Sequence, residues 1–175
     1  MNSMYKKTVR RLFYLYTGEF VSTLLFAVLW ALYLQNSEWT APYLTSLASV
    51  YFFLLLEMIL LQGSYYWFLK WKQVRKRDFS NLPDQKMRLF SFFKKVNITL
   101  IALGIPLMIY EFMISSLIFY WCLFLYLFAI IEQINYYHIR LSYLSLEEIK
   151  QFIRQKGFSK SKLAKEIEQY RNGIS

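Results

Sequence analysis

Four long apolar runs constrain this chain more than any other feature of its sequence. They cover about residues 12–34, 43–69, 96–113 and 116–137. An α-helix rises about 1.5 Å per residue, so roughly 20 apolar residues cross the hydrocarbon core of a bilayer. Each run has about that length or more. The sequence therefore predicts an all-α integral membrane protein, a four-helix bundle of four spans.

The segments between these runs differ in length and polarity. The first and second runs are joined by "QNSEWTAP" and the third and fourth by "EFMISS", so each pair is typical of a hairpin with a short turn. A longer basic segment, "KWKQVRKRDFSNLPDQKMRLFSFFKK", joins the second and third runs. The composition agrees with a membrane location, because 57% of the 175 residues are hydrophobic and 21% are aromatic.

The basic residues are completely segregated along the chain. Of the 21 Lys and Arg residues, four lie in residues 1–11, nine in 70–95 and eight in 138–175, which leaves none in the two short turns. Lys and Arg accumulate on the cytoplasmic side of membrane spans. We therefore expect an integral protein of the cell (inner) membrane with both termini in the cytoplasm.

The net charge of +10 follows from this topology and does not require nucleic acid. Basic side chains next to a span attract anionic lipid headgroups. We expect contacts with anionic lipid or with a protein partner at Lys70, Lys72, Arg75, Lys76 and Arg77. No specific binding of nucleic acid is expected.

Several polar residues fall inside the predicted spans, where they are energetically costly and usually face the bundle interior. Glu19, Gln62 and Glu132 each lie eight residues inside a flanking basic residue, so they should share one layer. The predicted intramembrane polar cluster comprises Glu19, Glu57, Gln62, Glu132, Asn135 and Tyr136. Two interpretations stay open. The carboxyl groups either hydrogen-bond within the bundle and hold it together, or bind a cation, a cationic ligand or a proton.

The sequence offers little for catalysis or cofactor binding. A single cysteine, Cys122, and a single histidine, His138, do not supply a disulfide or a cysteine or histidine metal cluster within one chain. The five glycines are scattered and form no phosphate-binding loop. We expect no cofactor, no bound metal and no catalytic residue.

The C-terminal segment reads as a separate helical tail. Residues 1–143 form the expected transmembrane domain and residues 144–175 the cytoplasmic tail. In the tail, "SLEEIKQFIRQKG" and "SKSKLAKEIEQYR" each carry an apolar stripe at helical spacing. Two short helices are therefore predicted, which dock on the basic central segment or on a soluble partner.

Two motifs carry a resemblance to a known group of proteins. "GSYYWFLKWK" at 63–72 and "EQINYYHIRLSY" at 132–143, with four spans between basic segments, resemble an uncharacterised family of small membrane proteins from low-GC Gram-positive bacteria. The resemblance implies four helices and an inner-membrane location, and it supplies no activity.

Taken together, these features favour a non-enzymatic membrane anchor or sensor. Such a protein would assemble with itself, as a homo-oligomer, or with a cytoplasmic protein partner through its basic face. The alternative is a small transporter or channel for protons or cationic compounds that uses Glu19, Glu57 and Glu132. An intramembrane enzyme is third, because no nucleophile and base stand together.

Overall fold

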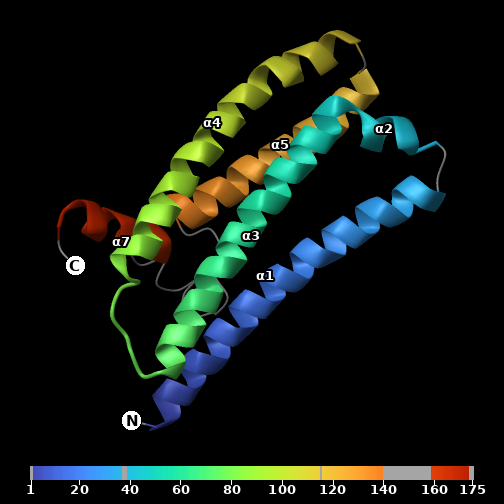
Figure 1. The fold of residues 1–175 in the computed structure, drawn as a ribbon. Helices are drawn as coiled ribbons and strands as arrows, with labels where there is room; N and C mark the ends of the chain where they lie inside the picture. The colour runs from blue at the N-terminus through green and yellow to red at the C-terminus, as the bar shows by residue number, and fades with distance from the viewer. Residues whose placement is uncertain (1, 37–38, 115, 140–158, 174–175) are drawn as a thin grey trace.

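The computed structural model describes residues 2–36, 39–114, 116–139 and 159–173, and most of the chain in these ranges is helical (Figure 1). The helices are α1 (Asn2–Asn36), α2 (Ala41–Thr45), α3 (Leu47–Arg75), α4 (Asp84–Ile114), α5 (Ser116–Tyr137) and α7 (Lys162–Arg171). Helices α1, α3, α4 and α5 are long and apolar enough to cross a membrane, with mean hydropathies of 1.6 to 2.0. The predicted fold class is confirmed. Of the two predicted tail helices, the second is α7, and the first lies outside the described residues.

Helix α3 forms the centre of the bundle. It packs against α1 on one side and against α4 and α5 on the other (Figure 1). In its most apolar stretch 61% of the residues are buried, against 11% for α1 and 22% for α4 and α5. Helix α1 therefore touches the bundle mainly along one face and leaves most of its apolar surface to lipid or to another protein.

Three of the spans are longer than the apolar runs indicated. The second run was expected to begin at 43, but the chain breaks at Ser46, whose hydroxyl accepts from the Ser49 N–H at 3.1 Å and so caps α3. Helix α1 begins at Asn2 instead of residue 12, and α4 begins at Asp84 instead of residue 96. The early start of α4 is stabilised by packing, because Met87 and Phe90 are fully buried on one helical face. Helix α5 matches the prediction.

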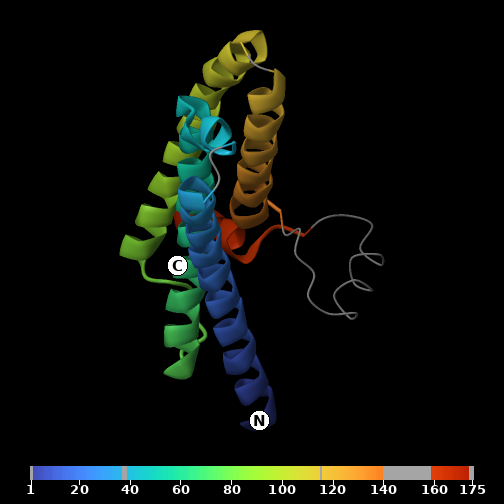
Figure 2. The same ribbon diagram turned by 90° about the vertical axis from the view of Figure 1, so that its right-hand side faces the viewer.

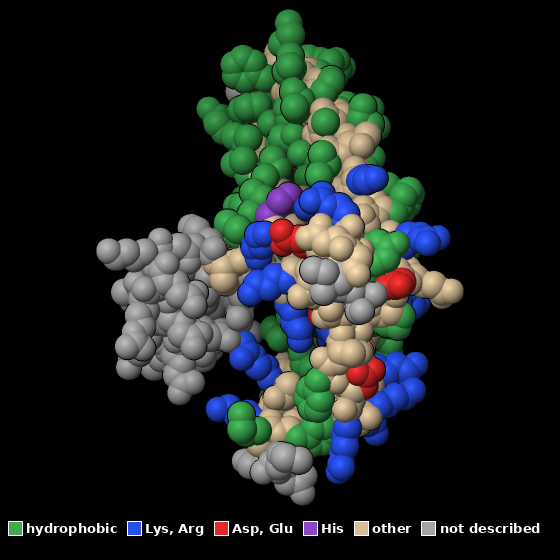
Figure 3. Space-filling view, turned by 90° about the vertical axis from the view of Figure 1, so that its left-hand side faces the viewer, with side chains coloured by type: hydrophobic (Ala, Val, Ile, Leu, Met, Phe, Trp, Pro, Cys, Tyr) green, Lys and Arg blue, Asp and Glu red, His purple; other side chains and the backbone are tan. Residues whose placement is uncertain are grey.

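The long helices exceed the thickness of a bilayer core, and basic residues gather at one end of the bundle. A helix of 35 residues such as α1 is about 52 Å long, whereas the hydrocarbon core is roughly 30 Å thick. We call the end of the bundle that holds the beginning of α1, the α3–α4 loop and α7 the basic end. Figure 3 shows Lys and Arg side chains over this half of the visible face and hydrophobic side chains over the other half.

Helix α7 lies at the basic end, against the beginning of α4 and the end of α5 (Figures 1 and 2). Its N-cap is Ser161, whose hydroxyl oxygen accepts a hydrogen bond from the Ala164 N–H at 3.0 Å. Leu163 is 2% exposed and belongs to the core of the bundle. The described part of the predicted tail is thus packed against the spans.

Candidate functional site

Four of the six residues in the predicted polar cluster come together between α1 and α5. Glu19 of α1 lies beside the hydroxyl of Tyr136, the indole of Trp67 and the carboxyl of Glu132. The Glu132 Oε2 accepts a hydrogen bond from the Asn135 amide at 3.3 Å. The Glu19 Oε2 is buried and accepts no hydrogen bond from a described residue. A polar group of a ligand would find an acceptor there.

Two adjoining cavities open on this cluster, and both are lined by Glu19, Asn135 and Tyr136. The larger, of about 950 Å³, runs along α1 and faces α5. The smaller, of about 360 Å³, lies between α1, Tyr66 and Trp67 of α3, and the beginning of α7. Ligand sites in proteins commonly have volumes of about 300–1,000 Å³. We call them the α1–α5 cavity and the α7 cavity.

Gly63 of α3 makes this arrangement possible. A Cβ atom at position 63 would collide with the ring of Tyr136, including its hydroxyl, at 2.7 Å. The absence of a side chain lets the Tyr136 ring lie directly against α3 on its way to Glu19. Gly63 is thus a positioning residue for Tyr136, a role that the sequence by itself did not reveal.

Gln62, predicted in the same layer, belongs to a different cluster. Its amide exchanges two hydrogen bonds with Asn97 of α4, at 3.1 and 2.8 Å, and accepts one from the Tyr137 hydroxyl at 2.7 Å. Asn97 also donates to the Gln133 Oε1 of α5 at 2.8 Å. We call these four residues the amide cluster. They are buried and join α3, α4 and α5, so they act as hydrogen-bonding glue between spans.

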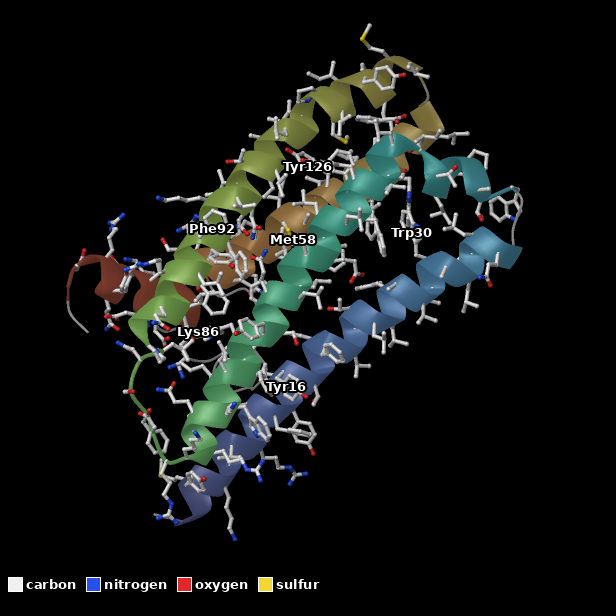
Figure 4. The ribbon with its side chains drawn as sticks, viewed as in Figure 1. Tyr16, Trp30, Met58, Lys86, Phe92 and Tyr126 are labelled. Atoms are coloured by element: carbon white, nitrogen blue, oxygen red, sulfur yellow. The ribbon has the colours of Figure 1, made fainter. Side chains whose placement is uncertain are left out.

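Glu57 lies apart from both clusters, and this corrects the prediction of a single group. It shares the α1-facing side of α3 with Phe53, which stacks on Trp30 at 4.1 Å, and with Ser64, which donates to the Tyr16 carbonyl at 3.3 Å. The Glu57 side chain is buried, but neither the α1–α5 cavity nor the α7 cavity includes it. Figure 4 shows Trp30 and Tyr16 on α1 beside α3.

Tyr136 connects the cavities to α7. Its side chain reaches the Glu19 carboxyl, while its backbone carbonyl accepts a hydrogen bond from the Ser161 hydroxyl. The neighbouring His138 carbonyl accepts from the Ser161 N–H at 3.1 Å. Tyr136 therefore touches the cavities with its side chain, while its carbonyl group and that of His138 hold the N-cap of α7.

Lys70 is not part of an accessible basic face, which corrects its predicted role. Its side chain is 3% exposed, and its Nζ lies 2.6 Å from the Oε1 of Glu166 on α7. The same ammonium donates to the Ser80 carbonyl at 3.0 Å and to the Gln73 Oε1 at 3.4 Å. The remaining Glu166 oxygen accepts from the Leu82 N–H at 3.4 Å. A buried ion pair therefore ties α7 to α3 and to the α3–α4 loop.

The other four predicted contact residues, Lys72, Arg75, Lys76 and Arg77, are exposed. Next to them, the α3–α4 loop is organised by Gln73, whose amide donates to the Asp78 carboxylate at 3.1 Å and to the Ser80 hydroxyl at 2.9 Å. Hydrogen bonds from Ser80, and the one from Gln73, lower the pKa of Asp78. These exposed cations thus lie beside an ordered turn.

Cations also crowd the α7 cavity. Its lining includes Arg11, Lys160, Lys162 and Lys165. Partial burial lowers the pKa of Lys162, the positive charges of Lys70 and Arg11 lower it further, and Glu166 opposes the shift. Burial and the charge of Lys94 likewise lower the pKa of His138, whereas the hydrogen bond that its imidazole donates to the Gln133 backbone carbonyl raises it. The site combines carboxyl groups inside the bundle with positive charge at the basic end.

A layer of aromatic rings lies beyond the cavities, toward the other end of the bundle. Phe26 and Phe128, which line the inner part of the α1–α5 cavity, meet edge to face at 6.1 Å. Further along, Trp30 stacks on Phe53 at 4.1 Å and on Trp121 at 6.2 Å. The cavity therefore extends from the basic end to this layer of rings.

No protein-family model matches the chain, and no curated protein or solved structure matches it either. The resemblance to small membrane proteins of low-GC Gram-positive bacteria therefore stays a prediction. Among the described residues, no group of three or more His, Cys, Asp and Glu side chains is placed to hold a metal ion. The site has to be interpreted from its own geometry.

Proposed function

We propose that this protein is a non-enzymatic membrane sensor. Occupancy of the α1–α5 cavity sets how firmly α7 docks, and the docked state presents or withholds the basic face for a cytoplasmic partner. The basic end lies in the cytoplasm, in accord with the distribution of Lys and Arg. In this scheme the anchor is the set of four spans and the output element is α7.

A single observation supports this proposal above all others, namely the double role of Tyr136. Its hydroxyl faces Glu19 in the cavity, and its carbonyl holds Ser161 at the beginning of α7. A ligand that competes for Glu19 or for the Tyr136 hydroxyl would shift the end of α5. Since the Ser161 hydroxyl is also the N-cap of α7, the same shift would weaken both the docking and the first turn of α7.

Cross-linking of α7 to the α3–α4 loop tests the proposal. The side chains of Asn81 and Gln169 are hydrogen-bonded at 2.8 Å, so cysteines at these positions in a Cys122→Ser background report docking through a short bis-maleimide. The substitution Tyr136→Phe removes only the hydroxyl. We expect the undocked population to rise about fivefold, the equivalent of one ordinary hydrogen bond.

The matched control is Tyr126→Phe, on the same helix. The Tyr126 hydroxyl donates to the Ile101 carbonyl at 2.8 Å, away from α7. Its loss should leave the cross-linking rate unchanged. Equal rates for the parent, Tyr136→Phe and Tyr126→Phe would reject the proposed link between the cavity and α7.

A transporter of protons or cationic compounds is the second candidate. It is favoured by the buried oxygens Glu19 Oε2 and Glu57 Oε1, which accept no hydrogen bond from a described residue. The aromatic layer of Trp30, Phe53 and Trp121 argues for the sensor, because it lies between the cavity and the far side of the bundle. A transporter would have to open that layer.

A further inference from the structure

The residues that line the α1–α5 cavity indicate the class of ligand that it binds. One face of α1 lines it with residues at helical spacing, from Lys7 and Arg11 through Gly18 and Ser22 to Phe26. The lining therefore changes along the helix from cationic to polar to apolar. That order matches the order of groups in an amphiphile of the cytoplasmic leaflet, whose charged head lies at the surface and whose chain points inward.

The cationic part of the cavity suits a phosphate group. Lys6, Lys7, Arg10 and Arg11 line it. Lys6 and Lys7 form no ion pair with a carboxylate in the described part of the chain. Arg10 donates to the Tyr14 hydroxyl at 3.0 and 3.2 Å and lies over that ring, which orients the guanidinium without neutralising it. Arginine and lysine together are strong donors to phosphate oxygens.

The polar part of the cavity suits a neutral hydrogen-bond donor. Glu19 lies eight residues beyond Arg11, or about 12 Å along the helix. The carboxyl oxygens of Glu19 and Glu132 are acceptors, and the Glu19 Oε2 accepts no hydrogen bond from a described residue. The long basic side chains at the head of the cavity and the Glu19 side chain cover part of this distance, so a hydroxyl group a few bonds from the bound phosphate would reach the Glu19 Oε2 and satisfy that oxygen.

The apolar part of the cavity suits a hydrocarbon chain. Leu60, Phe26 and Phe128 line it, and the contact between the two phenylalanines limits its depth. Helix α1 packs mainly on α3, and a hydrocarbon chain longer than this part of the cavity would extend from it into the surrounding lipid.

We propose that the α1–α5 cavity binds a phosphate-headed amphiphile that carries a free hydroxyl group near the phosphate, as a lysophospholipid does. The proposal rests on the proposed function, because it names the ligand of the same cavity. Lys6, Lys7, Arg10 and Arg11 bind the phosphate, Glu19 and Glu132 accept from the hydroxyl, and Phe26 and Phe128 contact the chain.

Fluorescence quenching tests the proposal directly. The purified full-length protein in a maltoside detergent is titrated with lysophosphatidylglycerol whose acyl chain is brominated, and tryptophan emission is followed. Saturable quenching is expected. The double substitution Lys7→Gln/Arg10→Gln should weaken binding about tenfold or more, since two charged donors are lost. Lys72→Gln/Lys76→Gln removes the same charge from exposed positions outside the cavity and should leave binding unchanged.

A second variant tests the hydroxyl. Glu19→Met should reduce the preference for the lysolipid over an analogue without the free hydroxyl to about one, while leaving the binding of that analogue unchanged. Unchanged binding of the analogue also shows that the variant is folded. A preference that persists in Glu19→Met would overturn the role of Glu19.

Three further outcomes decide the ligand class. If glycerol phosphate competes as well as the lysolipid, the ligand is a soluble phosphate ester and its assignment as an amphiphile is overturned. If dodecyltrimethylammonium binds more tightly than the lysolipid, the cavity prefers a cationic headgroup and the assignment of a phosphate headgroup is overturned. Absence of saturable quenching would overturn the proposal altogether.

The sensor proposal and the ligand proposal can be rejected independently of each other. Lysolipid binding without any change in the cross-linking of positions 81 and 169 would reject the sensor and retain the ligand. A response of that cross-linking to Tyr136→Phe without lysolipid binding would retain the sensor and reject the ligand.

Discussion

Lys70 of α3 and Glu166 of α7 form a buried ion pair, with the Nζ and Oε1 atoms 2.6 Å apart and both side chains less than 5% exposed. The pair joins α3, the most buried of the four long helices, to α7. A buried pair contributes little over an apolar pair of the same size, whereas a single buried charge without its partner is strongly destabilising. This asymmetry makes the contact testable.

We expect Glu166→Ala to release α7, at a cost of about 3–5 kcal/mol, because it leaves the Lys70 ammonium buried without a countercharge. The double substitution Lys70→Met/Glu166→Met should restore most of the docking. Cross-linking of positions 81 and 169 and thermal unfolding in detergent measure both effects. Equal loss of α7 docking in the single and the double variant would show that docking needs the charge pair itself, and not only the absence of an unpaired buried charge.

The amide cluster predicts a stability effect in the middle of the bundle. Asn97→Leu removes the group that bonds to both Gln62 and Gln133, and leaves the buried Gln62 Nε2 and Gln133 Oε1 without that partner. The expected loss is about 1–3 kcal/mol in the free energy of unfolding. Thr99→Val, two residues along the same helix, is the control, since Thr99 is exposed and bonds only to the Lys95 carbonyl of its own helix. Similar unfolding temperatures for both variants would contradict the assigned role.

Two glycines inside helices predict opposite outcomes for the same change. Gly18→Ala should be tolerated or slightly stabilising, because nothing lies within 4 Å of the added methyl group and alanine favours a helix by about 1 kcal/mol. Gly63→Ala should destabilise the protein, because the methyl group would meet the Tyr136 ring. The additional substitution Tyr136→Leu should relieve the clash. Thermal unfolding of the three variants tests this, and a failure of Tyr136→Leu to rescue would contradict the close approach.

The orientation of the chain in the membrane is tested by labelling single cysteines in a Cys122→Ser background. Trp39, in the turn between α1 and α2, is 77% exposed, and Asn172 follows α7 at the basic end. An impermeant maleimide applied to intact cells should label Trp39→Cys, and should label Asn172→Cys only after the membrane is permeabilised. Labelling of both from the outside would exclude four spans with cytoplasmic termini.

Glutamine substitutions separate the sensor from the transporter. In reconstituted vesicles, Glu19→Gln and Glu57→Gln should leave the uptake of protons and cationic dyes at the level of the parent protein, which should not exceed that of empty vesicles. Uptake by the parent that disappears in these variants at unchanged thermal stability would favour the transporter, because an amide neither exchanges a proton nor carries a charge.

The arrangement of spans was predictable because it depends on local properties. In hydrocarbon each backbone group must be satisfied within its own segment, so a long apolar run becomes a helix whatever its neighbours are. The four spans, and α5 with bounds 116–137, follow from that constraint. The helix ends were harder to predict. Helices α1, α3 and α4 extend past the apolar runs, because residues such as Met87 and Phe90 find packing partners outside the spans.

The contents of the site depended on which helical faces meet, and a single sequence does not contain that information. Equal depth placed Glu19, Gln62 and Glu132 in one layer, but Gln62 faces Asn97 and Gln133 while Glu19 faces Tyr136. Asn97 and Gln133 carried a signal that could have been used, since both are amides within the apolar runs 96–113 and 116–137.

The sequence by itself determined the four spans and the segregation of charge, because both arise from the transfer of each segment between water and lipid. The tertiary structure decided that Lys70 is buried against Glu166 and that Tyr136 crosses Gly63 to reach Glu19. Those contacts join residues far apart in the chain. They form only after the rotation of each helix is chosen, and that choice follows from the packing of the whole bundle.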